Sequence, residues 1–280
     1  MPTVAALLDS RAALLHLRRT LPAGPGTLVA CRSQPGLRRL YRTRLLDAVV
    51  LGLRGLRHRD LPGLRNDFPA VPVVVYGAFR PDDGELLHQL VSEEGVADVV
   101  VEGVDDAVVG ALVRRRALSG VRAEALADAP RLLRLTEDLQ RRAWAHLLAR
   151  GGQALQTGDL AAELGMSREH LSRQFAAGGA PNLKRVIDLL RVAAAAQLLA
   201  NPGYDLGTVA GILGFATRSH LHATTRRITG VGGNDLARLG PRGVLLAFRR
   251  EGMRSRVLGR RSKDRPRDSI TRPLAGMRRL

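Results

Sequence analysis

One short pattern occurs twice in the chain, and it constrains the fold more than any other feature. It reads SREHLSRQF at residues 167–175 and TRSHLHATT at residues 217–225. Arg, His and Leu take the second, fourth and fifth places in both copies, and an apolar stretch containing LGM or LGF precedes each one. Such a duplication predicts two copies of one supersecondary unit, with the same elements joined by the same turn.

Each copy predicts a helix-turn-helix. Gly165 and Gly214 stand where the first helix ends, at a position where a left-handed backbone favours glycine. Ser167 and Thr217 then serve as N-caps of the second helix, and each contributes about 1 kcal/mol by accepting bonds from free N–H groups. The polar residues of the second helix remain outside, where they suit a DNA major groove, because Arg can pair with guanine and Ser, His or Glu can read other base edges. Plain solvent exposure is the alternative for any single side chain.

The stretch between the copies, NLKRVIDLLRVAAAAQLLA at residues 182–200, is rich in helix-forming residues and is followed by Asn, Pro and Gly. A helix of this length spans roughly 28 Å. This is close to one turn of DNA, ~34 Å, so both recognition helices could enter successive major grooves on one face.

Residues 131–240 resemble the AraC/XylS-type DNA-binding domain over nearly its whole length. The residues that carry this resemblance are Ala161, Gly165, Ser167, Leu171 and Phe175 in the first copy, Arg191, Ala195, Leu198 and Leu199 in the connecting stretch, and Ile212, Gly214, Phe215 and Gly230 in or after the second. The resemblance implies a sequence-specific transcription regulator with an all-α double helix-turn-helix.

The resemblance also implies roles for single residues. Base contacts are expected from Glu169, Ser172 and Arg173 in the first recognition helix and from Arg218, Ser219 and His222 in the second. Phosphate contacts are expected from Arg168 and Arg226.

The second copy departs from the family pattern. Its two usual aromatic positions are Leu221 and Thr225, Ala223 replaces a common arginine, and Gly233 replaces a proline. Leu183 replaces the corresponding proline after the first copy. We therefore expect the second unit to pack less tightly and the first to dominate specificity.

The N-terminal half alternates short apolar runs with helix-length segments. The runs TLVAC, LLDAVVLGL, VPVVVYGAF and VADVVVEGV predict a parallel sheet covered by helices over residues 25–120. Residues 4–20 predict an amphipathic helix, within an N-terminal segment of residues 1–24.

Residues 45–118 resemble the last three strands of the response-regulator receiver domain. The positions of its chemistry hold other residues: Gly52 for the phosphate-accepting aspartate, Gly77 for the hydroxyl residue and Glu102 for the lysine. Arg32 and Ser33, after TLVAC, replace the acidic pair that holds Mg²⁺, and the stretch from TLVAC to LLDAVV is short for two helices and a strand. A degenerate domain that is not phosphorylated is expected, serving dimerisation or partner contact, with a pure scaffold as the alternative.

The positive charge is concentrated toward the C-terminus. The chain carries a net charge of +18, and residues 241–280 hold 13 of the 44 Lys and Arg but only 3 of the 26 Asp and Glu. This excess suits a polyanion, although a solvated basic surface would look the same. Residues 121–130 predict a linker and residues 241–280 a flexible basic tail.

The sequence offers no residue pattern typical of other function classes. Cys31 is the single cysteine, which excludes a disulfide within the chain, and the sequence shows no spacing typical of a metal, cofactor or catalytic site. No signal peptide or membrane-spanning run is evident, so a bacterial cytoplasmic, nucleoid-associated location is expected. Double-stranded DNA is the expected partner, with RNA polymerase and a second copy, bound through the N-terminal domain, as further candidates. Two rivals stay open: a nucleoid-type protein with mainly nonspecific affinity, and a catalytic first domain that binds a nucleotide or accepts phosphate.

Overall fold

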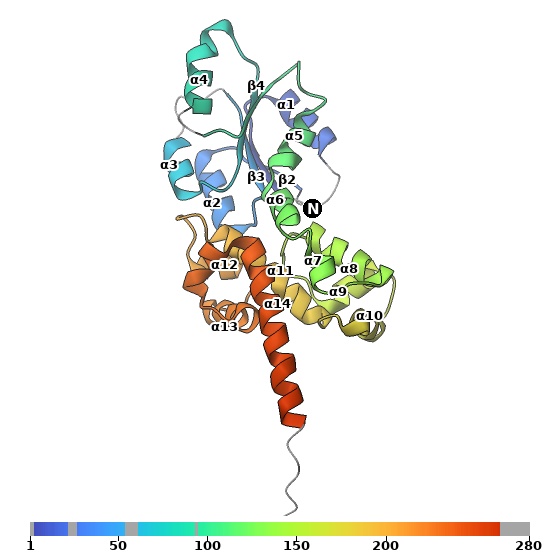
Figure 1. The fold of residues 1–280 in the computed structure, drawn as a ribbon. Coiled ribbons are helices and arrows are strands. Elements are labelled where there is room, and N and C mark those ends of the chain that lie inside the picture. Colours follow the sequence, from blue (N-terminus) through green and yellow to red (C-terminus); the bar gives the residue numbers. More distant parts are fainter. Residues whose placement is uncertain (1–2, 22–26, 54–60, 93–94, 264–280) are drawn as a thin grey trace, which may run out of the picture.

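A parallel sheet forms the N-terminal half of the protein, and helices form the C-terminal half (Figure 1). The computed structural model describes residues 3–21, 27–53, 61–92 and 95–263, with side chains up to residue 252. The prediction of an α/β part followed by an all-α part is thereby confirmed.

The sheet has five parallel strands in the order β2-β1-β3-β4-β5. This is a doubly wound order: strands are added on one side of β1 and then on the other, so the order of winding switches between β1 and β3. The carboxyl ends of those two strands form the usual ligand crevice of such sheets. The strands are β1 (Val4–Leu7), β2 (Leu28–Ala30), β3 (Ala48–Leu51), β4 (Val73–Gly77) and β5 (Asp98–Val101).

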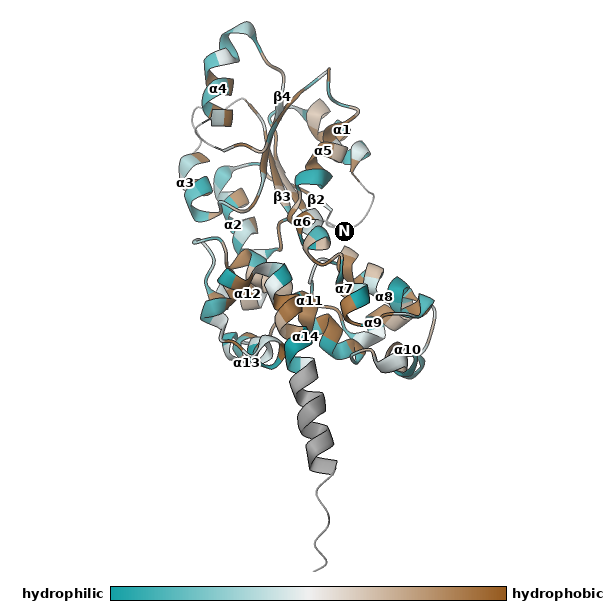
Figure 2. Ribbon diagram, in the orientation of Figure 1, coloured by the Kyte–Doolittle hydropathy of each residue, from teal (hydrophilic) through white to brown (hydrophobic). Residues whose placement is uncertain are grey.

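Helices cover both faces of the sheet. Helices α1 (Arg11–Thr20) and α5 (Val109–Arg116) pack together on one face. The other face is covered by α2 (Gln34–Thr43), α3 (Leu61–Asp67) and α4 (Gly84–Ser92) (Figure 1). Figure 2 shows the hydrophobic colours on the strands between these layers and on the central helix of the other half.

The expected helix over residues 4–20 is wrong at its start, because residues 4–7 form β1, an interior strand of the sheet. All four residues of VAAL are buried, so the strand lacks the alternation of a half-exposed strand and resembles a buried helical segment in sequence. TLVAC therefore supplies the second strand of the sheet. The short stretch after it has to hold only one helix, α2, before β3 begins. The expected position of the acidic pair is also wrong: Leu8 and Asp9 follow the first strand, whereas Arg32 and Ser33 come after the second.

Seven helices form the core of the C-terminal half. They are α8 (Asp138–Ala149), α9 (Thr157–Glu163), α10 (Arg168–Phe175), α11 (Leu183–Leu198), α12 (Leu206–Ile212), α13 (Arg218–Thr229) and α14 (Leu236–Lys263). Thirteen of the sixteen residues of α11 are buried, and the predicted helix between the two copies is confirmed. None of the helices in the described part of the chain is long and apolar enough to cross a membrane.

The expected linker at residues 121–130 is wrong. Helices α6 (Leu118–Ala125) and α7 (Ala129–Leu132) occupy this region, and α6 contacts both α5 and α11. The physical reason is burial: Arg122, Leu126 and Ala129 are at most 1 % exposed, so this segment is packed into the protein instead of linking two domains through solvent.

The expected flexible tail is wrong for residues 241–263, which belong to α14. The helix is kinked at Gly240 (φ 58°), and Pro241 follows the kink, as proline is tolerated where a helix begins. Val244, Leu245 and Phe248 lie at helical spacing and are buried in the core around α11. The rest of the expected tail, residues 264–280, lies outside the described residues.

The two halves are joined by a specific contact beyond the chain connection. The side-chain oxygen of Asn201 accepts a hydrogen bond from the backbone N–H of Ala70 (2.7 Å), and the N–H of Gly203 donates to the carbonyl of Asp67 (2.7 Å). The ring of Tyr204 packs at 4.8 Å from that of Phe68. The turn after α11 is therefore docked on the α3–β4 connection of the sheet domain.

Candidate nucleic-acid interface

The first duplicated unit is a helix-turn-helix built from α9 and α10. Its turn is closed by a bond from the N–H of Met166 to the carbonyl of Ala161 (3.0 Å), and Gly165 has φ 69°, which glycine adopts without strain. Ser167 caps α10 by accepting from the N–H of His170 (3.2 Å). Leu171 is completely buried, so the opposite face of α10 is left to solvent.

The second unit repeats this geometry with α12 and α13. The N–H of Phe215 donates to the carbonyl of Ala210 (2.8 Å), and Gly214 has φ 68°. Thr217 caps α13 by accepting from the N–H of His220 (3.0 Å). The structural equivalence of the two turns explains the repeated sequence pattern.

Helix α12 has a charged cap of its own. The Asp205 carboxylate accepts from the backbone N–H groups of Thr208 (2.9 Å) and Gly207 (2.7 Å). The bonds from the Thr208 N–H and hydroxyl lower the pKa of Asp205, because they favour the ionised form. The cap therefore fixes the start of the second unit.

All eight side chains expected to contact DNA lie on these two units, and Ser172 alone among them is half-buried rather than exposed. A hollow of about 400 Å³ brings Arg168 and Ser172 together with Lys184, Asp188 and Arg191 of α11. The N-terminal turn of α9 also lines it, through Gln156, Thr157 and Gly158. Sequence reasoning missed this contribution of α11, although residues 184, 188 and 191 have the spacing of one helix face.

A second hollow, of about 270 Å³, lies beside α13. It brings together Arg218, Ser219 and His222 with Leu206 and Asn234. Asn234 was not anticipated, since it lies beyond the repeated pattern. Glu169, Arg173 and Arg226 line neither hollow and lie on the open surface of their helices.

Helix α11 holds the second unit through Arg191. Its guanidinium lies 3.8 Å from the ring centroid of Phe215 and donates to the carbonyl of Leu213 (3.0 Å). On the same helix, Asp188 binds Arg227 of α13 (2.7 Å). These contacts hold α12 and α13 against α11, the helix that connects the two units.

The duplicated geometry has a counterpart among known proteins. Residues 160–233 match the model of a helix-turn-helix domain family. This region is an AraC-type helix-turn-helix domain. The match begins within α9 and ends after α13, so it includes both units and α11. AraC-type domains bind DNA in transcription regulators, so the match supports a DNA-binding role in transcription regulation. No curated protein and no solved structure matches the chain.

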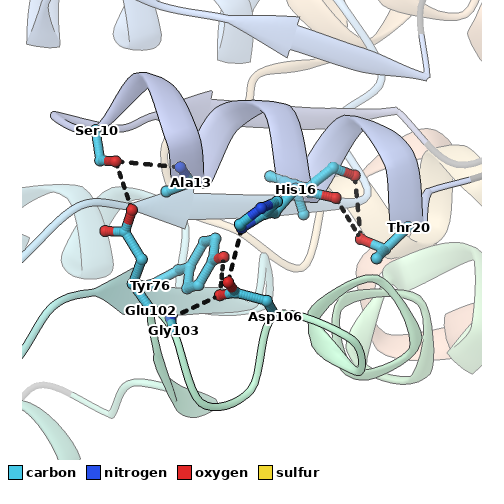
Figure 3. A network of polar contacts seen from close by, with 9 residues as sticks. Ser10, Ala13, His16, Thr20, Tyr76, Glu102, Gly103 and Asp106 are labelled. Atoms are coloured by element: carbon cyan, nitrogen blue, oxygen red, sulfur yellow. Dashed lines mark hydrogen bonds and ion pairs between the residues drawn. The ribbon is translucent and has the colours of Figure 1, made fainter.

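Gly52, Gly77 and Glu102, the residues expected at the positions of receiver chemistry, lie together at the carboxyl edge of the sheet. A hollow of about 340 Å³ is lined by Asp9, Gly52, Gly77 and Glu102. A Cβ atom on Gly52 would lie 2.6 Å from a carboxylate oxygen of Asp9, so no side chain fits there without movement of Asp9. Glu102 accepts a hydrogen bond from the hydroxyl of Ser10 (2.5 Å), as Figure 3 shows.

Next to this hollow, a polar network ties α1 to the loop after β5 (Figure 3). Asp106 accepts from the hydroxyl of Tyr76 (2.5 Å) and the N–H of Gly103 (2.9 Å), and it lies 2.7 Å from Nδ1 of His16. The Tyr76 hydroxyl is the main cause that lowers the pKa of Asp106. The contacts fasten two elements and leave the Asp106 carboxylate occupied by structural partners.

Proposed function

We propose that the protein is a sequence-specific regulator whose two recognition helices read adjacent major-groove segments of one DNA site. The observation that carries this proposal is that one buried helix, α11, is bonded to the second unit and shares a hollow with the first. The sixteen residues of α11 span about 24 Å, which is comparable with the ~34 Å turn of DNA. A rigid rod of this length supports simultaneous entry of α10 and α13.

Within this proposal, the exposed side chains take the roles that their positions favour. Glu169, Ser172 and Arg173 read bases from α10, and Arg218, Ser219 and His222 read bases from α13. Arg168 and Arg226 bind phosphates. Lys184 joins them as a phosphate contact, because it lies in the same hollow as Arg168 and Ser172.

Footprinting and competition test the proposal together. Fragments selected from the genome should show protection of two groove segments about one helical turn apart. Competition with random DNA at two salt concentrations should give a specificity ratio of about 10³ or more. Protection of a single segment, or a ratio below about ten, would favour the nucleoid-type alternative.

We further propose that the sheet domain is a degenerate receiver-like module that serves contact with a partner. Its strand order and the close approach of Gly52 to Asp9 support this proposal. Val104 and Val108, on the loop after β5, are 76 % and 48 % exposed and favour a second copy as that partner, with RNA polymerase as the other candidate. Incubation with acetyl phosphate should leave the mass of the protein unchanged. Light scattering should show a dimer that Val104→Ser weakens.

A further inference from the structure

An arginine-lined cavity of about 350 Å³ lies where α7, α11 and α14 meet. Four arginines from three segments of the chain line it: Arg131, Arg134, Arg185 and Arg249. The described residues that line this cavity include no Asp or Glu. Asp128, outside the lining, forms ion pairs with both Arg131 (3.7 Å) and Arg242 (3.4 Å). The described lining of the cavity therefore carries four positive charges and no negative one.

The backbone at Arg134 is unusual. Among the described residues, Arg134 is the only non-glycine with a positive φ (57°). It follows α7 at a helix end closed by a bond from the N–H of Leu135 to the carbonyl of Pro130 (2.8 Å), where glycine is normally favoured. A strained residue at such a position is a reason to look for a use of its side chain.

The cavity also has an apolar part, which indicates what kind of anion it suits. Phe248 and Leu132 line it, and the Arg185 guanidinium lies 5.0 Å from the Phe248 ring centroid. This stacking orients Arg185. Guanidinium groups bind carboxylate and phosphate with paired hydrogen bonds, so the lining suits an anionic group attached to a small apolar body.

The cavity is separate from the DNA-facing hollow beside α10. Lys184, Asp188 and Arg191 line that hollow, whereas Arg185, one position further along α11, lines the arginine cavity. Successive residues of a helix point about 100° apart, so the two sites use different faces of α11.

We propose that this cavity binds a small organic dianion, a phosphate ester or a dicarboxylate. The ligand would bridge α7, the start of α11 and α14, and so stabilise the DNA-binding half in one arrangement. The site requires neither the sheet domain nor a bound DNA.

Calorimetry on the full chain tests the proposal with two probes, phenyl phosphate and phthalate, which distinguish the phosphate from the carboxylate. At least one should bind at constant ionic strength. Arg249→Ala should weaken that binding by about tenfold or more, since a charge-assisted hydrogen bond is lost. Arg250→Ala is the matched control: it removes the same charge from the next residue of α14, which does not line the cavity, and should leave binding within about twofold.

Arg134→Gly separates ligand binding from folding. Glycine relieves the positive φ, so the variant should melt no lower than the wild type, yet it should bind the probe more weakly. Failure of both probes to bind, or equal losses in Arg249→Ala and Arg250→Ala, would overturn the proposal. Displacement of the bound probe by a short DNA duplex would also overturn it, because the arginines would then belong to the DNA interface. Sequence-specific DNA binding is measured in a separate experiment, so failure of the proposed function can be told apart from failure of ligand binding at this cavity.

Discussion

The guanidinium of Arg122 lies 3.3 Å from the carboxylate of Asp47, and neither side chain is more than 2 % exposed. Asp47 precedes β3 in the sheet domain, and Arg122 also donates to Gln197 of α11 (2.8 Å). Burial raises the pKa of Asp47 and lowers the pKa of Arg122, because it disfavours both charged forms. The ion pair thus connects the sheet to the central helix of the DNA-binding half.

Arg122→Met should reduce the free energy of unfolding by about 3–5 kcal/mol, because it leaves the Asp47 carboxylate buried without its charge partner. Urea unfolding followed by circular dichroism measures the loss. Arg116→Met, which breaks the exposed pair with Asp98, is the control and should have a much smaller effect. Replacing Asp47 by leucine as well should restore part of the lost stability. If the double variant recovers no stability, the loss in Arg122→Met does not come from the unpaired charge.

The sequence was sufficient to predict features that depend on local signals. The two helix-turn-helix units and α11 follow from repeated residues, helix-forming composition and terminal glycines, all within short windows. The parallel sheet follows from its buried β-branched runs. These predictions needed no knowledge of distant contacts.

The features that the sequence did not predict depend on contacts between distant segments. Arg122 looks like a solvent-facing charge until Asp47, 75 residues earlier, is brought against it. Val244 and Phe248 form an apolar face only when α11 is there to cover it. The strand at Val4–Leu7 is buried on both sides, which removes the alternation that distinguishes a strand from a helix.

Thr225→Val should stabilise the protein by roughly 1 kcal/mol. Thr225 is completely buried, and its hydroxyl has no hydrogen-bond partner among the described residues. Valine has nearly the same shape and removes the unsatisfied hydroxyl. Thermal or urea unfolding measures the gain. Thr229→Val is the matched control: it deletes a hydroxyl that donates to the carbonyl of Thr225 (2.8 Å) and should not stabilise. Destabilisation by Thr225→Val would show that the hydroxyl has an unseen partner.

Tyr76→Phe should raise the pKa of Asp106 toward the ordinary carboxyl value, since the Tyr76 hydroxyl is the main cause of its depression. A lowered pKa in the folded state stabilises the fold above the usual carboxyl pKa, and this stabilisation is lost as the pH falls through the lowered value. The stability advantage of the wild type over Tyr76→Phe should therefore be largest near neutral pH and shrink in acid. Carboxyl carbon NMR measures the pKa, and the Gly103 N–H and His16 remain as partners of Asp106 in the variant. An unchanged Asp106 pKa would contradict the assignment.

Arg173→Ala should weaken binding to the selected DNA site by ~1–3 kcal/mol and leave affinity for random DNA nearly intact, because a base contact is lost while phosphate contacts remain. Arg226→Ala is the informative comparison, since it removes an exposed arginine with a proposed phosphate role. It should weaken binding to both DNAs alike. The slope of log Kd against log salt concentration should fall by about one, as expected for the loss of one phosphate contact. Gel-shift titrations at several salt concentrations measure both effects. Equal losses on both DNAs for Arg173→Ala would remove Arg173 from base reading. Specificity would then rest on the residues of α10 and α11 that line the hollow around Ser172.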